Sequence, residues 1–172
     1  MPIMTIPARL ADLEFEIEAP PGFAEPPLPQ CDPDFSDPTV TGPLTLLASP
    51  VAAAFLTVSA RPAYEEGSVL QWLIYLTRHH GITTTALTPG EVGGRRHRHP
   101  AVIAEGHQVQ DGTNLRMVFA GLEDGGRFVI IHAMCPEELW ASYGEGLRAA
   151  VASFELARPQ GPRAPVVPVA AE

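Results

Sequence analysis

The sequence predicts one layered α+β domain in which two amphipathic helices pack against a mostly antiparallel sheet. Three observations support this prediction. The length of 172 residues suits a single domain. Two segments, near residues 65–81 and 136–156, space their apolar residues as helices do, and each needs a sheet face to cover its apolar stripe. The segments between and before them carry strand and hairpin signals.

The N-terminal part is predicted to contain a strand, a long loop and a strand pair. In "LEFEIEA" (residues 13–19) apolar and acidic residues alternate, which is typical of a half-buried strand. Residues 20–38 include seven prolines in nineteen residues, so we expect a long irregular loop within the domain. Then "GPLTLLAS" (42–49) and "VAAAFLTVSARP" (51–62) are predicted to pair, with Ser49-Pro50 at the turn.

The first helix is predicted in "EEGSVLQWLIYLTRHHG" (65–81). Ser68 is the predicted N-cap, because its hydroxyl can accept a hydrogen bond from a backbone N–H of the first turn. Basic residues near its end suit the negative end of the helix dipole. Gly81 follows as the residue that ends the helix.

The rest of the chain predicts a strand at 82–87, an antiparallel meander and a closing helix. The meander comprises 101–110, 115–123 and 127–135, joined by turns at "DGTN" and "DGG". The last helix is expected to start at Pro136 and to end near Leu156. Residues 1–157 thus form the predicted domain, and the Pro/Ala-rich residues 158–172 a disordered tail.

Composition and charge narrow the classes of partner. The net charge of -9 would repel nucleic-acid phosphate, so no nucleic-acid partner is expected. No run of eighteen apolar residues exists, and we therefore expect no membrane partner. Cys31 and Cys135 lie far apart, and the N-terminus lacks the pattern of a secretion signal; both points favour a cytoplasmic location.

The string "GGRRHRHP" (93–100) is the first candidate site. His97 and His99 fall on one side of an extended segment, which is a workable geometry for a metal ion. Arg95, Arg96 and the backbone N–H groups beside the glycines could instead bind an anion. A third interpretation is a solvated connecting loop. No accompanying metal or phosphate motif is present, so no metal site or cofactor is predicted outright.

Covalent catalysis has one candidate pair. Cys135 precedes the last helix, a position that can lower the pKa of a thiol, and His132 lies three residues earlier. Residues three apart on a strand point to opposite faces, so these two side chains should not meet. No other catalytic motif is found, and we predict that the protein is not an enzyme.

The chain resembles the PsbP-like (Mog-type, DcrB-like) proteins over residues 11–157. The resemblance lies in "FEIEAPPGF", in "GSVLQWLIYL" with its internal tryptophan, in the meander, and in "EELWASYGEGLRAAVASFEL" with its terminal Ser-Phe pair. It implies an α/β/α sandwich around a curved, mostly antiparallel sheet flanked by two main helices, and a non-enzymatic role. Similar domains include photosystem II accessory subunits, a Ran-binding regulator, surface lipoproteins and adaptor chaperones for secretion effectors.

The leading hypothesis is a non-catalytic cytoplasmic adaptor or chaperone-like protein. The predicted partner surface is a sheet face around Met117, Phe119, Ile130 and Met134, because these strands are rich in apolar residues. Self-association of two copies through that face, giving a homodimer, fits the same pattern. The alternative is a ligand- or metal-binding regulator that uses residues 93–100.

Overall fold

The computed structural model describes residues 13–26 and 34–163, and these form a mixed α+β fold. Its main sheet has seven strands in the order β2-β3-β8-β7-β6-β4, and β5 also pairs with β6. The strands are β2 (Gly42–Ala48), β3 (Phe55–Pro62), β4 (Thr83–Thr84), β5 (Thr88–Gly93), β6 (Arg98–Gln110), β7 (Thr113–Asp124) and β8 (Arg127–Pro136). Every pairing among these strands is antiparallel, as predicted.

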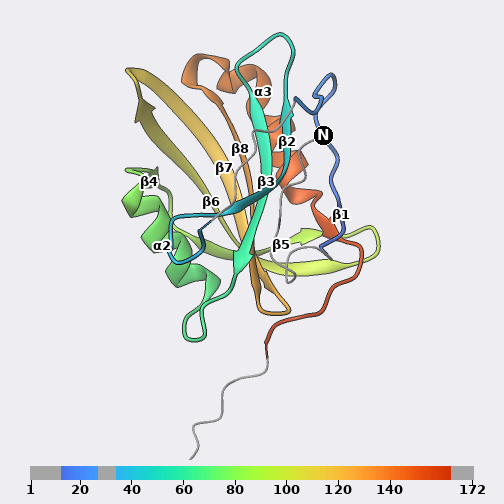
Figure 1. The fold of residues 1–172 in the computed structure, drawn as a ribbon. Coiled ribbons are helices and arrows are strands. Elements are labelled where there is room, and N and C mark those ends of the chain that lie inside the picture. Colours follow the sequence, from blue (N-terminus) through green and yellow to red (C-terminus); the bar gives the residue numbers. More distant parts are fainter. Residues whose placement is uncertain (1–12, 27–33, 164–172) are drawn as a thin grey trace, which may run out of the picture.

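Two helices lie on opposite sides of this sheet, α2 (Val69–His79) and α3 (Trp140–Ala152) (Figure 1). Strand β8 shows the division, because its side chains alternate between the two sides. Val129 and Ile131 belong to the core cluster that contains Leu147 of α3. Phe128 belongs to a second cluster, with Trp72 of α2. The predicted α/β/α arrangement is therefore confirmed.

Helix α2 begins and ends as the sequence predicts. The Ser68 side chain accepts from the N–H of Gln71, and the Gln71 side chain accepts from the N–H of Ser68, which makes a capping box. Gly81 follows with φ +65°, a conformation that glycine adopts without strain.

The closing helix differs from its prediction at both ends. Pro136 is the last residue of β8 and not the first of a helix. A single 3-10 turn, η1 (Glu137–Leu139), precedes α3, which already ends at Ala152. Residues Glu155–Leu156 form strand β9, which pairs with β1 (Phe15–Glu16). The apolar period of the sequence runs past the helix because Phe154 and Leu156 remain buried in the same core.

Three strand predictions also need correction. The strand expected over 13–19 is paired only at the two residues of β1, and that expected over 82–87 only at the two residues of β4. Strand β5 was not predicted, because "TPGEVG" lacks an alternating apolar pattern. Because β5 pairs with β6, the Gly/Arg/His string forms the turn of a hairpin, and Arg98 and His99 lie within β6.

The C-terminal segment continues past the predicted domain boundary at residue 157 and is hydrogen-bonded to the end of β7. The backbone N–H groups of Gln160 and Gly161 donate to the Asp124 carboxylate at 2.6 and 2.8 Å. Arg163 pairs with the Glu123 carboxylate. Residues 164–172 of the predicted tail, and 27–33 of the Pro-rich loop with Cys31, lie outside the described residues. Neither helix of the described part is long and apolar enough to span a membrane.

Candidate binding pocket

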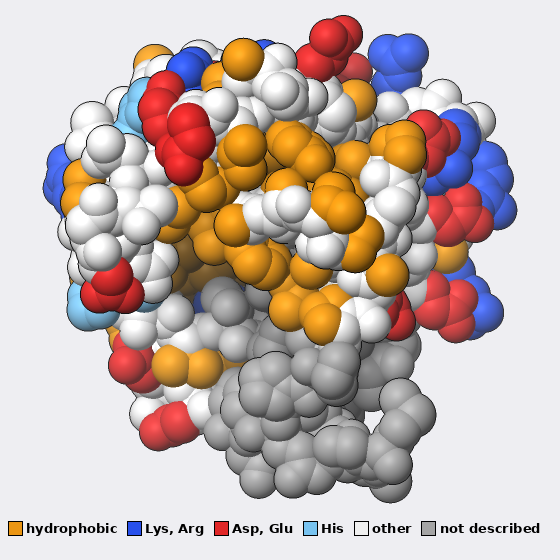
Figure 2. Space-filling view, turned by 90° about the horizontal axis from the view of Figure 1, so that it is seen from above, with side chains coloured by type: hydrophobic (Ala, Val, Ile, Leu, Met, Phe, Trp, Pro, Cys, Tyr) orange, Lys and Arg blue, Asp and Glu red, His pale blue; other side chains and the backbone are white. Residues whose placement is uncertain are grey.

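The sheet face that carries α2 also holds a pocket of about 350 Å³ beside the C-terminal end of that helix. Its described walls come from α2, from the strands β3, β6, β7 and β8, and from the loop before β2. The lining residues are Thr39, Thr41, Thr57, Ser59, Leu76, Thr77, His80, Ile82, Gln108, Gln110, Phe119, Ile130, His132 and Met134. Seen from above, the molecule gathers hydrophobic side chains around a hollow, and most charged side chains lie toward the outside (Figure 2).

The pocket combines apolar side chains with uncharged polar ones. Five lining residues are aliphatic, aromatic or thioether side chains, and seven are threonine, serine or glutamine. Among the described lining residues there is no Asp, Glu or Arg. The two imidazoles, His80 and His132, are its only titratable groups in that set. Such a lining suits an uncharged, mostly apolar occupant that also makes hydrogen bonds.

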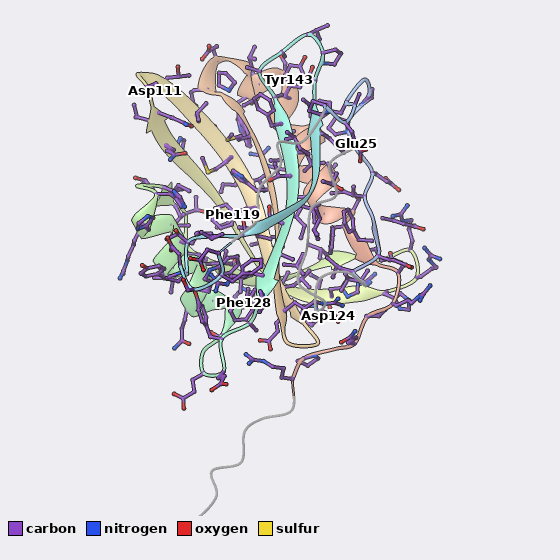
Figure 3. The ribbon with its side chains drawn as sticks, viewed as in Figure 1. Glu25, Asp111, Phe119, Asp124, Phe128 and Tyr143 are labelled. Atoms are coloured by element: carbon purple, nitrogen blue, oxygen red, sulfur yellow. The ribbon has the colours of Figure 1, made fainter. Side chains whose placement is uncertain are left out.

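The pocket stays open because α2 covers only part of this face. The helix packs closely on the sheet at Gly121, where a Cβ atom would lie 2.5 Å from Leu73 Cδ1. Phe119 and Phe128 both lie on the α2 side of the sheet, and Phe128 lies below Phe119 in the view of Figure 3. The Trp72 ring stacks on Phe128, with centroids 5.5 Å apart, and so covers the part of this face around Phe128. Phe119, in contrast, lines the pocket.

A buried arginine holds the loop that supplies the Thr39 and Thr41 wall. The Arg61 side chain is 3% exposed and donates to the carbonyl oxygens of Phe35, Asp37 and Val40 at 3.0–3.3 Å. Its guanidinium also lies over the Tyr64 ring, 4.6 Å from the centroid. Because the guanidinium bonds several carbonyls at once, it orders this end of the Pro-rich loop against the sheet.

Trp72 and Tyr64 also bind the same loop through hydrogen bonds. The Trp72 indole N–H and the Tyr64 hydroxyl both donate to the Pro38 carbonyl, at 3.0 and 3.3 Å. Thr39 follows directly, and its backbone N–H donates to the Asp37 carboxylate at 2.8 Å. The loop wall is therefore held to α2 as well as to β3.

His132 contributes an imidazole ring for which the described residues provide no hydrogen-bond partner. Its Nε2 is buried and unpaired, and no hydrogen bond joins either ring nitrogen to another described residue. The ring meets the Phe119 ring edge to face, with centroids 6.5 Å apart. Burial, aided by repulsion from His80, lowers the pKa of His132 to about 4, so this ring is neutral at neutral pH.

The residues predicted as a partner surface divide between this pocket and the core. Phe119, Ile130 and Met134 line the pocket. Met117, at 0% exposure, packs in the core cluster beneath α2 and presents no surface. The threonine and glutamine residues of the pocket were missed, because isolated polar residues on strands and loops resemble an ordinary solvent-facing side.

The Gly/Arg/His loop already encloses an anion, the side chain of Glu155. Its carboxylate accepts from the backbone N–H groups of Gly94, Arg95, Arg96 and His97 at 2.9–3.3 Å. Burial opposes ionisation, but these four hydrogen bonds together hold the pKa of Glu155 below its usual value. Sequence reasoning missed Glu155, since it lies about sixty positions away and was assigned to a helix end.

The side chains of this loop also have partners within the chain. Arg95 pairs with Glu16 and Glu18, and Arg96 with Glu16 at 2.6 Å. Arg98 pairs with Glu91 at 3.4 Å. The four backbone N–H groups and the three guanidinium groups that were candidates for binding an external anion therefore all face carboxylates of the protein itself.

The two histidines of the loop differ in their surroundings. His97 is exposed, whereas His99 is 6% exposed and its Nε2 accepts from the N–H of Leu156 at 3.0 Å. Burial lowers the pKa of His99, which keeps this acceptor nitrogen unprotonated. The described residues contain no group of three or more His, Cys, Asp and Glu side chains arranged for a metal ion.

His132 and Cys135 lie on opposite faces of β8, as the strand period predicts. Cys135 is buried in the cluster beneath α3, whereas His132 lines the pocket on the other side. Burial, together with Glu137 and Glu138, raises the pKa of the Cys135 thiol. A protonated, enclosed thiol is a poor nucleophile.

Comparison with known proteins shows a likeness of fold. The chain matches LpqN, "involved in cell envelope biogenesis of Mycobacterium tuberculosis", with a TM-score of 0.56 and 8% identity over 84% of each chain. It matches cyanobacterial PsbP (CyanoP) from Synechocystis sp. PCC 6803 with a TM-score of 0.53 and 10% identity, over 83% of this chain and 86% of that one. No family model and no curated protein sequence matches. The fold is therefore PsbP-like, as the sequence resemblance implied.

Proposed function

We propose that this protein is a non-catalytic, cytoplasmic adaptor or chaperone-like protein that binds a partner polypeptide in the pocket beside α2. The observation that carries the proposal is the lining of that pocket, apolar side chains ringed by uncharged hydrogen-bonding groups. Threonine and glutamine side chains can bond the peptide groups of a bound segment, while Phe119, Ile130 and Met134 receive an apolar side chain.

Two features support a binding role over a catalytic one. The imidazole and the thiol that could react lie on opposite faces of β8. The neutral His132 ring, which has no hydrogen-bond partner among the described residues, can bond an occupant of the pocket. We also propose that the chain is related to the Mog-type and DcrB-like proteins, and a non-catalytic adaptor role of the kind found among similar domains requires only a binding surface. The free, buried thiol of Cys135 supports the cytoplasmic location.

The test is capture of a partner from the native host with a matched pair of variants. Ile130→Asp places a charge in the pocket, whereas Val51→Asp places the same charge on a side chain that is 85% exposed in the turn between β2 and β3. We expect Ile130→Asp to lose the partner and Val51→Asp to keep it. Circular dichroism of both variants confirms that they fold.

Two results would contradict this proposal. One is a partner that Ile130→Asp binds as well as the wild-type protein does. The other is concentration-dependent dimerisation, measured by sedimentation, that Ile130→Asp abolishes; the occupant would then be a second copy of the chain.

A further inference from the structure

The proposed function leaves open which group of the partner enters the pocket, and the inference here rests on that function. We propose that a tyrosine side chain of the partner occupies the pocket, with its ring against Phe119 and Met134 and its hydroxyl bonded to the imidazole of His132. The size, the charge and the unsatisfied polar group of the pocket each support one part of this assignment.

The pocket is large enough to admit a large side chain together with part of the segment that carries it. Its volume of about 350 Å³ lies near the lower end of the range for small-ligand sites, roughly 300–1,000 Å³. Tyrosine, tryptophan and arginine are the side chains that most often anchor protein interfaces, and they do so in pockets that exclude water.

The charge of the lining excludes arginine and the other charged side chains. No carboxylate is present among the described lining residues to pair with a guanidinium or an ammonium group, and no guanidinium to pair with a carboxylate. A charged group buried without a partner costs much free energy, so the occupant is uncharged.

The apolar wall favours an aromatic ring. The Phe119 ring lies in this wall, and it already makes an edge-to-face contact with His132. Aromatic pairs gain from such offset or perpendicular arrangements, and a methionine thioether gains from contact with an aromatic ring edge. Met134 supplies the thioether here.

The unpaired imidazole selects the hydroxyl. A buried polar atom without a partner is unfavourable, and neither ring nitrogen of His132 has one among the described residues. A neutral imidazole donates from one nitrogen and accepts at the other. A phenolic hydroxyl both donates and accepts, so it can bond an imidazole nitrogen in either tautomer. An indole N–H only donates, and a phenyl ring does neither.

The experiment compares the two smallest probes that differ by this hydroxyl. p-Cresol is the side chain of tyrosine, and toluene is that of phenylalanine. Each is titrated into the uniformly ¹⁵N-labelled full chain at neutral pH, and backbone amide shifts report the affinity and the site. We expect p-cresol to bind about fivefold more tightly than toluene, the effect of one net hydrogen bond. The shifts should centre on β7 and β8 near Phe119 and His132.

A substitution at His132 tests the hydrogen bond itself. His132→Leu should remove the preference for p-cresol, while His97→Leu, on the exposed hairpin turn, should retain it. If His132→Leu fails to fold, the imidazole ¹⁵N shifts of the wild-type protein give the same information. They should change on addition of p-cresol and stay constant with toluene.

The outcomes separate this inference from the proposed function. Equal affinity for the two probes, or a p-cresol preference that survives in His132→Leu, would overturn the tyrosine assignment. If Ile130→Asp still lost the captured partner, the pocket would remain the binding site for another side chain. A partner that binds Ile130→Asp normally would overturn both proposals, because no partner tyrosine then enters the pocket.

Discussion

The Glu155 carboxylate accepts a hydrogen bond from the backbone N–H of Arg95 at 2.9 Å, although sixty positions separate the two residues. Glu155 is 1% exposed and fills the hairpin turn between β5 and β6. The turn is shaped for this contact by Gly93, where φ is +87° and a Cβ atom would lie 2.5 Å from the His97 carbonyl oxygen. The loop thus fastens β9, and through it β1, to the edge of the main sheet.

Replacing Glu155 by glutamine should destabilise the protein. An amide presents only one acceptor oxygen, and its NH₂ group would face backbone N–H donors. Urea unfolding should show a larger loss of stability for Glu155→Gln than for Glu16→Gln. The latter removes only exposed ion pairs, worth less than about 1 kcal/mol. Equal losses for the two variants would show that the enclosed carboxylate contributes no more than a surface pair.

The pKa of Glu155 predicts how the stability of the wild-type protein depends on pH. Its folded-state pKa is depressed, so its contribution is present above the unfolded-state pKa of a glutamate and is lost as pH falls through the folded value. Urea unfolding in the acid range should therefore show a steeper loss for the wild-type protein than for Glu155→Gln. Parallel curves would contradict the assignment.

His132 should also make stability fall on acidification, over a different range of pH. Burial lowers its pKa from 6.5 to about 4, so the unfolded chain binds the proton more readily. Stability should fall as pH drops from 6.5 towards 4, by about 2 to 3 kcal/mol in total for this group. Urea unfolding of His132→Leu between these values should give a flatter curve; the slope that remains includes His99, whose pKa is also lowered.

The buried pair of Asp124 and Arg127 should be sensitive to loss of one charge. Their side chains are 3% and 2% exposed and meet at 2.8 Å, and Asp124 also accepts from the N–H groups of Gln160 and Gly161. Asp124→Asn should cost about 3 kcal/mol, because it removes the negative charge from a buried, hydrogen-bonded ion pair. Hydrogen exchange should show faster opening of residues 157–163. Glu91→Gln, which removes an exposed pair, should leave that segment protected.

Close packing of α2 on the sheet should make Gly121 intolerant of a side chain. In Gly121→Ala the added methyl group would lie 2.5 Å from Leu73 Cδ1, within the contact between α2 and the sheet, and we expect a loss of about 1 to 3 kcal/mol. Gly146→Ala is the matched control. Gly146 lies in α3 with its nearest neighbour 4.0 Å from the added atom, so alanine should be neutral or stabilise by up to about 1 kcal/mol. Thermal unfolding distinguishes the two variants.

Several elements that depend on capping or turn chemistry agree with their predictions. Ser68 and Gln71 lie within one helical turn, so the start of α2 depends on neighbours in the sequence. The turns at residues 111–112 and 125–126 place Asp or Gly at positive φ, as hairpin turns require. The strand period likewise put His132 and Cys135 on opposite faces. The end of α3 was predicted wrongly, because burial of Phe154 and Leu156 continues the apolar pattern after the helical backbone has ended.

By itself, then, the amino-acid order determined the two helices and the antiparallel meander, since capping, turn chemistry and apolar period act between near neighbours. The PsbP-like class of fold was implied by the resemblance to known proteins and not by these local signals. Only the tertiary structure decided that Glu155 fills the Gly/Arg/His turn and that threonines, glutamines and His132 meet around one pocket. These residues are distant in sequence, and their contacts depend on how the sheet curves and on how much of it α2 covers. Neither quantity is encoded in any short segment of the chain.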